Sequence, residues 1–308
     1  MKKVVVFGGG TGLSSLLKGL KLFPIDITAV VSVADDGSST GKLRNEFDIP
    51  AVGDLRNVVI ALSETEPLLE ELFQYRFISK GSFDRHSVGN ILLTALLNIN
   101  GNLTDAVSSF GKILNLKGKV LPLTEDRVTL VAYTENEKII GESNITKAFK
   151  KIKTIKYLKK PKVLKQVIDE INRADLIIFS MGSLYTSIIP HLLCKEVRTA
   201  LKNSLSKKMY ICNIMTEHGE TDNFKVKDHV DLLNKYAKFN MIDVVVANTT
   251  KIDFKIKEKY YKLEKSKPVE INKVKIKMIK EDLAIVKNEM VRHDPLKTGY
   301  VIFSYLMR

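Results

Sequence analysis

The stretch with the clearest capacity for chemistry holds two adjacent carboxylates, Asp35 and Asp36, followed by Gly37, Ser38 and, after a second glycine, Arg44. Carboxylates suit sugar hydroxyls or a divalent cation, whereas backbone amides and a guanidinium suit phosphate oxygens. A segment that only filled a core would have no use for this composition. We therefore interpret it as half of a ligand site.

A second group of candidate ligand positions lies near the N-terminus, where the apolar run 4–7 predicts a buried strand and spaced leucines predict a helix from about Ser14. The turn between them consists of Gly8, Gly9, Gly10, Thr11 and Gly12. Such a turn presents unpaired N–H groups at the positive end of a helix dipole, so it favours phosphate. A tight structural turn is the alternative, but it needs fewer glycines.

Two standard nucleotide-binding patterns fit this sequence incompletely. The dinucleotide fingerprint lacks its third glycine, because Leu13 stands at that position. The run from Gly37 through Gly41 to Lys42 is one residue shorter than a P-loop, and Leu43 follows it instead of serine or threonine. We therefore exclude a P-loop NTPase and retain a phosphate-binding turn of another kind.

The order of apolar runs predicts the framework that positions these groups. The run 27–33 precedes the acidic loop, and the runs 175–179, 209–213 and 243–247 are each followed by polar residues. Strands that alternate with helices predict an α/β fold with a mostly parallel sheet flanked by helices. Because the carboxyl ends of parallel strands lie at one edge, we expect a single cleft there.

Further candidate ligand residues stand near the ends of expected strands and the starts of expected helices. They are Asp54, Arg56, Asn57, Ser87, Asn90, Gly182, Ser183 and Arg292. Their amide, hydroxyl, carboxylate and guanidinium groups suit a ligand with phosphates and hydroxyls. Helix capping is the structural alternative for Asp54, for Ser87 and for the triplet 292–294.

The segment around 119–160 changes period and predicts a small antiparallel insertion within a single domain that spans 1–308. The expected strands of this insertion are 120–123, 128–133 and 138–140, with an edge strand near 155–158.

The net charge of +14 is concentrated in two segments of the chain. Nine lysines and no acidic residue lie in 145–165, and eleven lysines with four acidic residues lie in 251–280. Neither segment has a base-reading or aromatic-stacking motif, so we favour a solvated lysine surface over a specific nucleic-acid site.

Membrane insertion and export are not expected. No apolar run approaches the roughly 20 residues that span a bilayer, and the short run after Met1 lacks the features of a signal peptide. We therefore expect a cytoplasmic protein. The number and spacing of Cys194 and Cys212 fit neither a disulfide framework nor a zinc site, so buried thiols are expected.

Six motifs in order resemble the CofD-like family, and more narrowly its YvcK-type branch of gluconeogenesis factors. They are Gly8-Gly9-Gly10-Thr11-Gly12, Ser32-Val33-Ala34-Asp35-Asp36-Gly37, Pro50-Ala51-Val52-Gly53-Asp54-Leu55-Arg56-Asn57, His86-Ser87-Val88-Gly89-Asn90, Gly182-Ser183-Leu184-Tyr185-Thr186-Ser187 and Arg292-His293-Asp294-Pro295. They run from the first expected strand to the last expected helix, so the resemblance covers the whole chain.

This resemblance implies a Rossmann-like α/β fold and a cytoplasmic protein whose cleft binds a nucleotide-sugar, especially a UDP-sugar such as UDP-N-acetylglucosamine, or a dinucleotide. It also implies a regulatory role in cell shape and envelope synthesis on gluconeogenic carbon sources, no required cofactor, and a homodimer. The sister branch comprises 2-phospho-L-lactate transferases, which use a nucleotide-activated donor and a divalent metal.

The two branches give two hypotheses. A regulator without turnover would bind hydroxyls through Asp35, Asp36 and Asp54, and a pyrophosphate through the glycine turns and an arginine. In a transferase, Asp36 and Asp54 become the candidate catalytic residues: Asp36, with Asp35, would hold Mg²⁺ on a donor diphosphate, and Asp54 would orient an acceptor hydroxyl.

Two departures from the family pattern bear on this choice. Arg56 stands where the transferase branch carries a second aspartate, and a guanidinium there disfavours a bound cation. The regulator hypothesis is therefore favoured. In the loop 215–221, Glu217 and His218 replace the glutamine and proline of the YvcK-type branch, so we assign this loop no role.

Overall fold

The computed structural model describes residues 1–308 and centres on a seven-stranded sheet in which all neighbouring strands are parallel. In spatial order the strands are β10 (Lys277–Glu281), β9 (Val244–Asn248), β8 (Lys207–Ile211), β7 (Leu176–Phe179), β1 (Lys2–Gly8), β2 (Ile25–Val31) and β3 (Lys119–Pro122). The central strands are continuous apolar runs, because helices cover both of their faces. The predicted α/β fold is confirmed.

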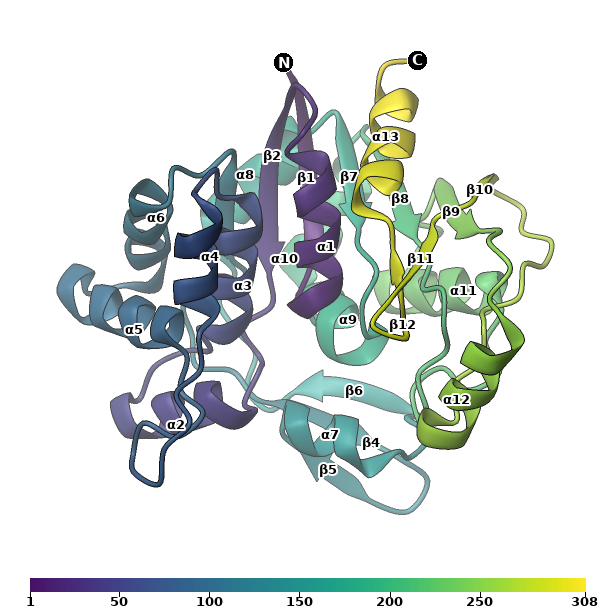
Figure 1. Cartoon of the computed structure of the whole chain (residues 1–308). Coiled ribbons are helices and arrows are strands. Elements are labelled where there is room, and N and C mark those ends of the chain that lie inside the picture. The colour runs from purple at the N-terminus through teal and green to yellow at the C-terminus, as the bar shows by residue number, and fades with distance from the viewer.

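Helices form a layer on each face of the sheet (Figure 1). One layer consists of α1 (Gly10–Leu20), α3 (Gly53–Leu62), α6 (Leu103–Ile113) and α13 (Pro295–Leu306), with α4 (Pro67–Gln74) and α5 (Val88–Asn100) packed outside it. The other consists of α8 (Lys165–Arg173), α9 (Ile189–Leu193), α10 (Lys195–Asn203) and α11 (Val226–Ala237). A π-helical turn, η1 (Leu184–Ile188), precedes α9.

The strand order creates a switch point between β1 and β7. From β1 the chain builds outward through β2 to β3, and it later returns to the other side of β1 and builds from β7 to β10. The connections after β1 and β7 therefore diverge to opposite faces, which opens a crevice at the carboxyl edge of the sheet. The position of this crevice follows from topology alone.

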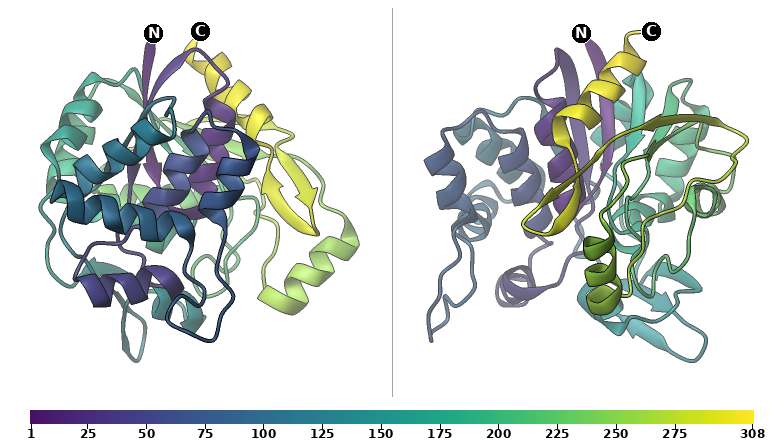
Figure 2. Two further views of the ribbon diagram at one scale, coloured as in Figure 1. Left: turned by 60° about the vertical axis from the view of Figure 1, so that its left-hand side comes forward. Right: turned by 45° about the vertical axis from the view of Figure 1, so that its right-hand side comes forward.

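A small antiparallel lobe lies across this carboxyl edge. It contains β4 (Leu130–Tyr133), β5 (Lys138–Ile140), β6 (Thr154–Tyr157) and the helix α7 (Glu142–Ala148). Both chain termini lie at the opposite end of the sheet, as the two views of Figure 2 show. The helix α2 (Ser38–Phe47) also lies at the carboxyl edge, on the β2 side (Figure 1).

Hydrogen bonds attach the lobe on the β7 and β8 side of the switch point. Ile152 N donates to Gly219 O at 3.3 Å, and the Tyr185 hydroxyl donates to Ile152 O at 3.3 Å. Ile155 N donates to the Tyr236 hydroxyl at 3.0 Å. These bonds come from three different elements, so the lobe is fixed to the sheet domain and not only tethered by its ends.

The lysine-rich helix α12 (Phe254–Glu264) and the hairpin of β11 (Ala284–Lys287) and β12 (Met290–His293) complete the rim of the crevice. No residue of α12 is buried. The Tyr260 hydroxyl accepts a hydrogen bond from Val291 N at 2.8 Å, and Lys259 pairs with Glu289 on the hairpin. This helix is thus held by a few polar contacts and a small apolar cluster around Ile214, Ile252 and Val291.

Two expectations about these elements were wrong. The run 120–123 belongs to β3, which pairs in parallel with β2 in the main sheet and is not part of the antiparallel lobe. The first helix begins at Gly10, four residues before the expected start at Ser14, because the glycine turn is itself the first turn of α1. The strands at 130–133, 138–140 and 154–157 pair as predicted.

Cys194 and Cys212 are buried and unpaired, as expected. No helix here has both the length and the apolar composition required to cross a bilayer.

Candidate functional site

The two turns that flank the switch point lie in direct backbone contact. A Cβ atom at Gly12 would stand 1.9 Å from the Met181 carbonyl oxygen, so only glycine allows this approach. Gly10, at the start of α1, has a φ of 58°, a conformation that favours glycine. The glycines of the turn 8–12 therefore allow the two turns to come into contact and also leave backbone amides exposed.

A cavity of about 380 Å³ lies over these turns, within the usual range for small-molecule sites. Its lining comes from six segments that are far apart in the sequence. The residues are Gly9, Gly10, Thr11, Gly12, Ser15, Glu142, Thr146, Met181, Gly182, Ser183, Thr186, Ser187, Asn213, Ile214, Met215, Thr216, Glu217, Tyr260, Glu264, Ser266, Val291, Arg292 and His293.

The turn after β7 is held rigidly by its neighbours. Asn213, which follows β8, donates from Nδ2 to Gly182 O at 2.9 Å and accepts from Gly182 N at 3.3 Å. Ser183 caps η1 by accepting from Thr186 N, and its hydroxyl donates to Glu220. The cavity thus has one wall of fixed hydroxyl and backbone groups, suited to a ligand rich in acceptors and hydroxyls.

Two carboxyl groups close to the glycine turn 8–12 have raised pKa values. Burial and the charge of Asp35 raise the pKa of Asp54 to about 7, although the Gly10 amide opposes the shift. Burial, followed by Asp35 and Asp36, raises the pKa of Glu142 to about 7. Near neutral pH each group is therefore able to accept or donate a proton.

A second pair of acids lies beside the turn after β7, where Glu217 lines the cavity and Glu220 does not. Burial is the main cause that raises the pKa of both Glu217 and Glu220, and Glu217 also responds to the charge of its partner. Hydrogen bonds from Ser183 and from the Tyr185 amide reach Glu220. The pair therefore carries less than two full negative charges, which lowers its repulsion toward an anionic ligand.

Arg292 is the only arginine or lysine in the cavity lining. It extends from β12, where its Nη1 donates to Val291 O at 3.0 Å. The neighbouring His293 is buried, its Nε2 donates to Cys212 O at 3.1 Å, and burial lowers its pKa to about 4, so it stays neutral. Asp294 caps α13 by accepting from Lys297 N, which is the structural role considered for this triplet.

Asp36 does not face the cavity, contrary to expectation. Its oxygens accept the backbone amides of Glu142 at 3.2 Å and Ser143 at 2.8 Å, at the start of α7. Asp36 therefore fixes the lobe on the β2 side of the switch point. Through this contact it places Glu142 in the cavity lining, a carboxylate that the sequence analysis did not identify.

The rest of the acidic loop also bonds mainly to itself. Asp35 accepts from Gly37 N at 2.9 Å, and its backbone oxygen accepts from Arg44 Nη1 at 2.7 Å. Arg44 also donates from Nη2 to Val128 O at 2.6 Å, so it braces the loop and is not directed at the cavity. Ser38 is exposed in the first turn of α2.

The remaining predicted residues lie beside the cavity or beyond it. Asp54 lies against the first turn, since a Cβ at Gly9 would stand 2.8 Å from its Oδ2. Gly8 is buried under the turn against Ser180. Ser87 caps α5, as the structural alternative proposed, and Asp54 lies in the first turn of α3 without capping it. Arg56, Asn57 and Asn90 do not line the cavity.

The donor set does not fit the divalent metal of the transferase branch. Both Asp36 oxygens and one Asp35 oxygen accept backbone amides. No group of three or more His, Cys, Asp or Glu side chains is arranged to hold a metal ion. Because Mg²⁺ requires several free oxygens in octahedral positions, we derive no step through a metal here.

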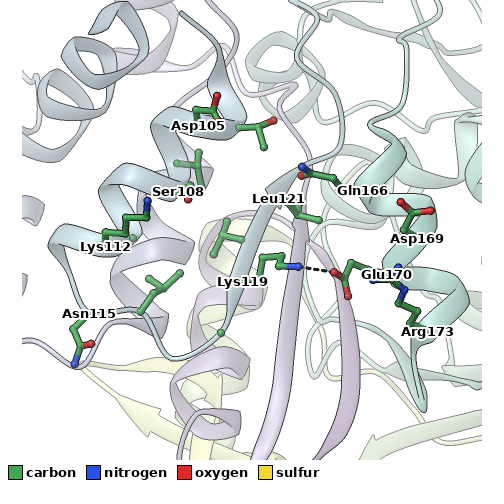
Figure 3. A pocket seen from close by; sticks show the side chains of 16 residues that line it. Asp105, Ser108, Lys112, Asn115, Lys119, Leu121, Gln166, Asp169, Glu170 and Arg173 are labelled. Carbon is green, nitrogen blue, oxygen red and sulfur yellow. Dashed lines mark hydrogen bonds and ion pairs between the residues drawn. The ribbon is translucent and has the colours of Figure 1, made fainter. Parts of the chain in front are cut away.

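A larger hollow of about 740 Å³ lies elsewhere, along the free edge of β3 between α6 and α8 (Figure 3). Its charges are balanced, with Asp105, Asp169 and Glu170 against three basic side chains, and Lys119 pairs with Glu170 at 2.6 Å. None of the glycine turns contributes to it. Size alone therefore does not identify the functional site.

A parallel sheet with a ligand-sized cavity at its switch point defines a Rossmann-like α/β protein. More narrowly, the chain belongs to the CofD family, since the family model described as 2-phospho-L-lactate transferase CofD matches residues 4–291. The resemblance inferred from the six motifs is confirmed at this level.

Relatives and a solved structure agree with this placement over the full length. The chain is 44% identical over 310 residues to a protein of Halalkalibacterium halodurans named gluconeogenesis factor, covering 98% of this chain and 96% of that one. It is 43% identical over 312 residues to the gluconeogenesis factor of Bacillus subtilis, with 99% and 98% covered. A crystal structure of protein BH3568 from Bacillus halodurans has a TM-score of 0.94 at 42% identity, with 98% and 99% covered.

Replacing Asp36 by alanine removes both acceptors at the start of α7. We expect a loss of about 1 kcal/mol in the free energy of unfolding, typical of a lost helix cap, and faster hydrogen exchange at the Glu142 and Ser143 amides. Asp231→Ala, which removes an exposed ion pair with Lys227, is the control and should change stability by less than about 0.5 kcal/mol. Unchanged exchange at both amides would contradict the anchoring role.

Asp54 predicts a specific dependence of stability on pH. Its pKa is raised in the folded chain, so between pH 4 and the folded pKa of about 7 the native state holds more protons than the unfolded one. The free energy of unfolding should therefore fall as pH rises through this window. Asp54→Asn cannot ionise and should be more stable than the native chain at pH 8, by about 1 kcal/mol or more.

Urea unfolding at pH 5 and pH 8 measures this effect. Asp175→Asn is the matched control of opposite sign, because the Lys3 amide and Lys2 lower the pKa of Asp175 and stabilise its charged form. It should reduce stability at pH 8. If Asp54→Asn had the same pH profile as the native chain, the assignment of a raised pKa to Asp54 would be wrong.

Proposed function

We propose that this chain binds a nucleotide-sugar, a UDP-sugar such as UDP-N-acetylglucosamine, in the cavity at the switch point. The observation that carries the proposal is the meeting of two turns rich in glycine and hydroxyl groups, 9–12 and 182–187, in one cavity with a single arginine. Backbone amides and a helix start suit a diphosphate, and hydroxyl and carboxyl groups suit a sugar.

Arg292 and Tyr260 give this ligand an orientation. Arg292 is the cavity's one strong cation, so it would pair with the diphosphate or a uracil carbonyl. Tyr260 presents an aromatic ring from α12, which suits stacking with a planar base. The sugar would then extend toward Glu142 and Thr146 on the lobe side, where acceptors for its hydroxyls are available.

We further propose a cytoplasmic regulatory role, in which ligand occupancy reports nucleotide-sugar supply to cell-envelope synthesis and cell shape during gluconeogenic growth. The curated relatives named gluconeogenesis factor support a link to this metabolic state.

Calorimetric titration with UDP-N-acetylglucosamine tests the binding proposal. We expect Arg292→Ala to bind at least about 10-fold more weakly, since a charge-assisted hydrogen bond contributes roughly 1.5–3 kcal/mol. Arg173→Ala, on the separate hollow of Figure 3, is the control and should bind like the native chain. No binding by the native chain, or full affinity in Arg292→Ala, would reject the proposal.

A transferase resembling 2-phospho-L-lactate transferase is the second candidate, favoured by the name of the matching family model and by Asp54 with its pKa near 7. The test is to incubate the chain with UDP-N-acetylglucosamine and acceptor alcohols, with and without Mg²⁺, and to measure free nucleotide by chromatography. For a binding protein we expect no product. Release that requires an acceptor and is lost in Asp54→Asn would establish the transferase instead.

A further inference from the structure

Arg56 is a buried cation without a partner. It is only 3% exposed, and its Nε atom has no hydrogen-bond partner. No carboxylate lies within ion-pair distance of it, although Asp54 and Asp35 are near enough to influence its pKa. Burial nevertheless lowers the pKa of Arg56 to about 10, which leaves the guanidinium charged at neutral pH.

Such an arrangement is costly for the folded chain on its own. A charge taken out of water requires an opposite charge or a full set of hydrogen bonds, and without them it destabilises the folded state. The buried Arg44 also has an unpartnered Nε atom, but both of its terminal nitrogens donate to backbone oxygens, whereas no nitrogen of the Arg56 side chain donates to any group of the chain. The unpaired state of Arg56 is therefore a feature that needs an explanation.

A second buried polar group without a complete set of partners lies beside Arg56. Its side chain packs on the first turn of α5, where a Cβ at Gly89 would stand 2.9 Å from the Arg56 Cδ atom. Next to Gly89, the buried Asn90 donates to Ser39 Oγ at 3.1 Å, while its Oδ1 has no partner. A second guanidinium, Arg76, is close enough to lower the pKa of Arg56.

Arg56 and the cavity lie on different sides of the first turn of α3. Residues two apart on a helix point about 200° away from each other. Accordingly, Asp54 lies against the glycine turn at Gly9, whereas Arg56 lies against α5. The first turn of α3 therefore stands between the nucleotide cavity and the guanidinium.

We infer that Arg56, with Asn90 and the start of α5, forms a second binding subsite that takes the phosphate or carboxylate group of a small molecule. This subsite goes beyond the proposed nucleotide-sugar site and does not depend on it. The anionic group would supply the acceptors that the guanidinium lacks, and the Asn90 amide would turn to meet it. The anion is either a free small acid or an acidic group on the sugar of a nucleotide-sugar.

Titration with inorganic phosphate tests the subsite on the full chain. We expect phosphate to raise the melting temperature of the native chain and to shift the NMR signal of the Arg56 Nε–H group. Arg56→Met should weaken this response at least 10-fold. It should also melt at the same temperature as the native chain or higher, because it keeps the apolar packing on Gly89 and removes a buried unpaired charge.

Two control variants locate the response. Arg173→Met, on the distant hollow, should respond to phosphate like the native chain. Asn90→Asp places a carboxylate beside the subsite and should weaken phosphate at least 10-fold, which keeps the test decisive if Arg56→Met does not fold. A native response in either Arg56→Met or Asn90→Asp, or no response by the native chain, would overturn the inference.

Repeating the titration in the presence of saturating UDP distinguishes the two sources of the anion. If phosphate still binds, the subsite takes a separate acid alongside the nucleotide. If a UDP-sugar whose sugar carries a carboxylate, such as UDP-glucuronic acid, blocks phosphate while UDP and the neutral UDP-N-acetylglucosamine do not, the subsite takes an acidic group on the sugar of the nucleotide ligand. Competition by UDP itself, with loss of the phosphate response in Arg292→Ala, would place the anion in the main cavity and reject the subsite. The titration without nucleotide remains decisive even if UDP does not bind.

Discussion

The close approach of the turns after β1 and β7 is the constraint on which the rest of the site depends. Gly12 allows the backbone of α1 to touch the Met181 carbonyl, and this contact brings both turns to one cavity. A side chain at this position would force the turns apart and separate their amides. The order of the strands creates the crevice, and the absence of a Cβ atom at Gly12 allows the turns on its two sides to line one cavity.

The charge of the cavity is determined by the small number of basic side chains that line it. Glu142, Glu217 and Glu264 line the cavity with Arg292 as the only strong base, while most of the chain's many lysines stay on the surface. Burial, followed by the charge of the nearby Asp35, raises the pKa values of Asp54 and Glu142, so these acids are not all ionised near neutral pH. Positive potential for an anionic ligand then comes mainly from backbone amides and helix starts, which do not titrate.

The sequence was sufficient to predict features that depend on neighbouring residues, such as turns and helix caps. It did not predict contacts between residues that are far apart in the chain. The glycine turns and the Ser87 cap depend on a few neighbouring residues, so their patterns were sufficient. The contact of Asp36 with Glu142 joins residues 106 apart, and no local pattern reports it. Tyr260 and Glu264 were not predicted to line the site, because the lysine-rich composition of their helix is typical of a solvent-exposed surface. The short run of β3 has no alternation from which parallel or antiparallel pairing could be judged.

The lobe that crosses the carboxyl edge is fastened at both of its sides, by Asp36 near β2 and by Gly219, Tyr185 and Tyr236 near β7 and β8. Because it is bonded on both sides of the crevice, the lobe is held in a fixed position over it. The weakly held wall is α12, which buries no residue. We therefore expect small molecules to enter and leave the cavity beneath α12, while the lobe keeps its position over the crevice.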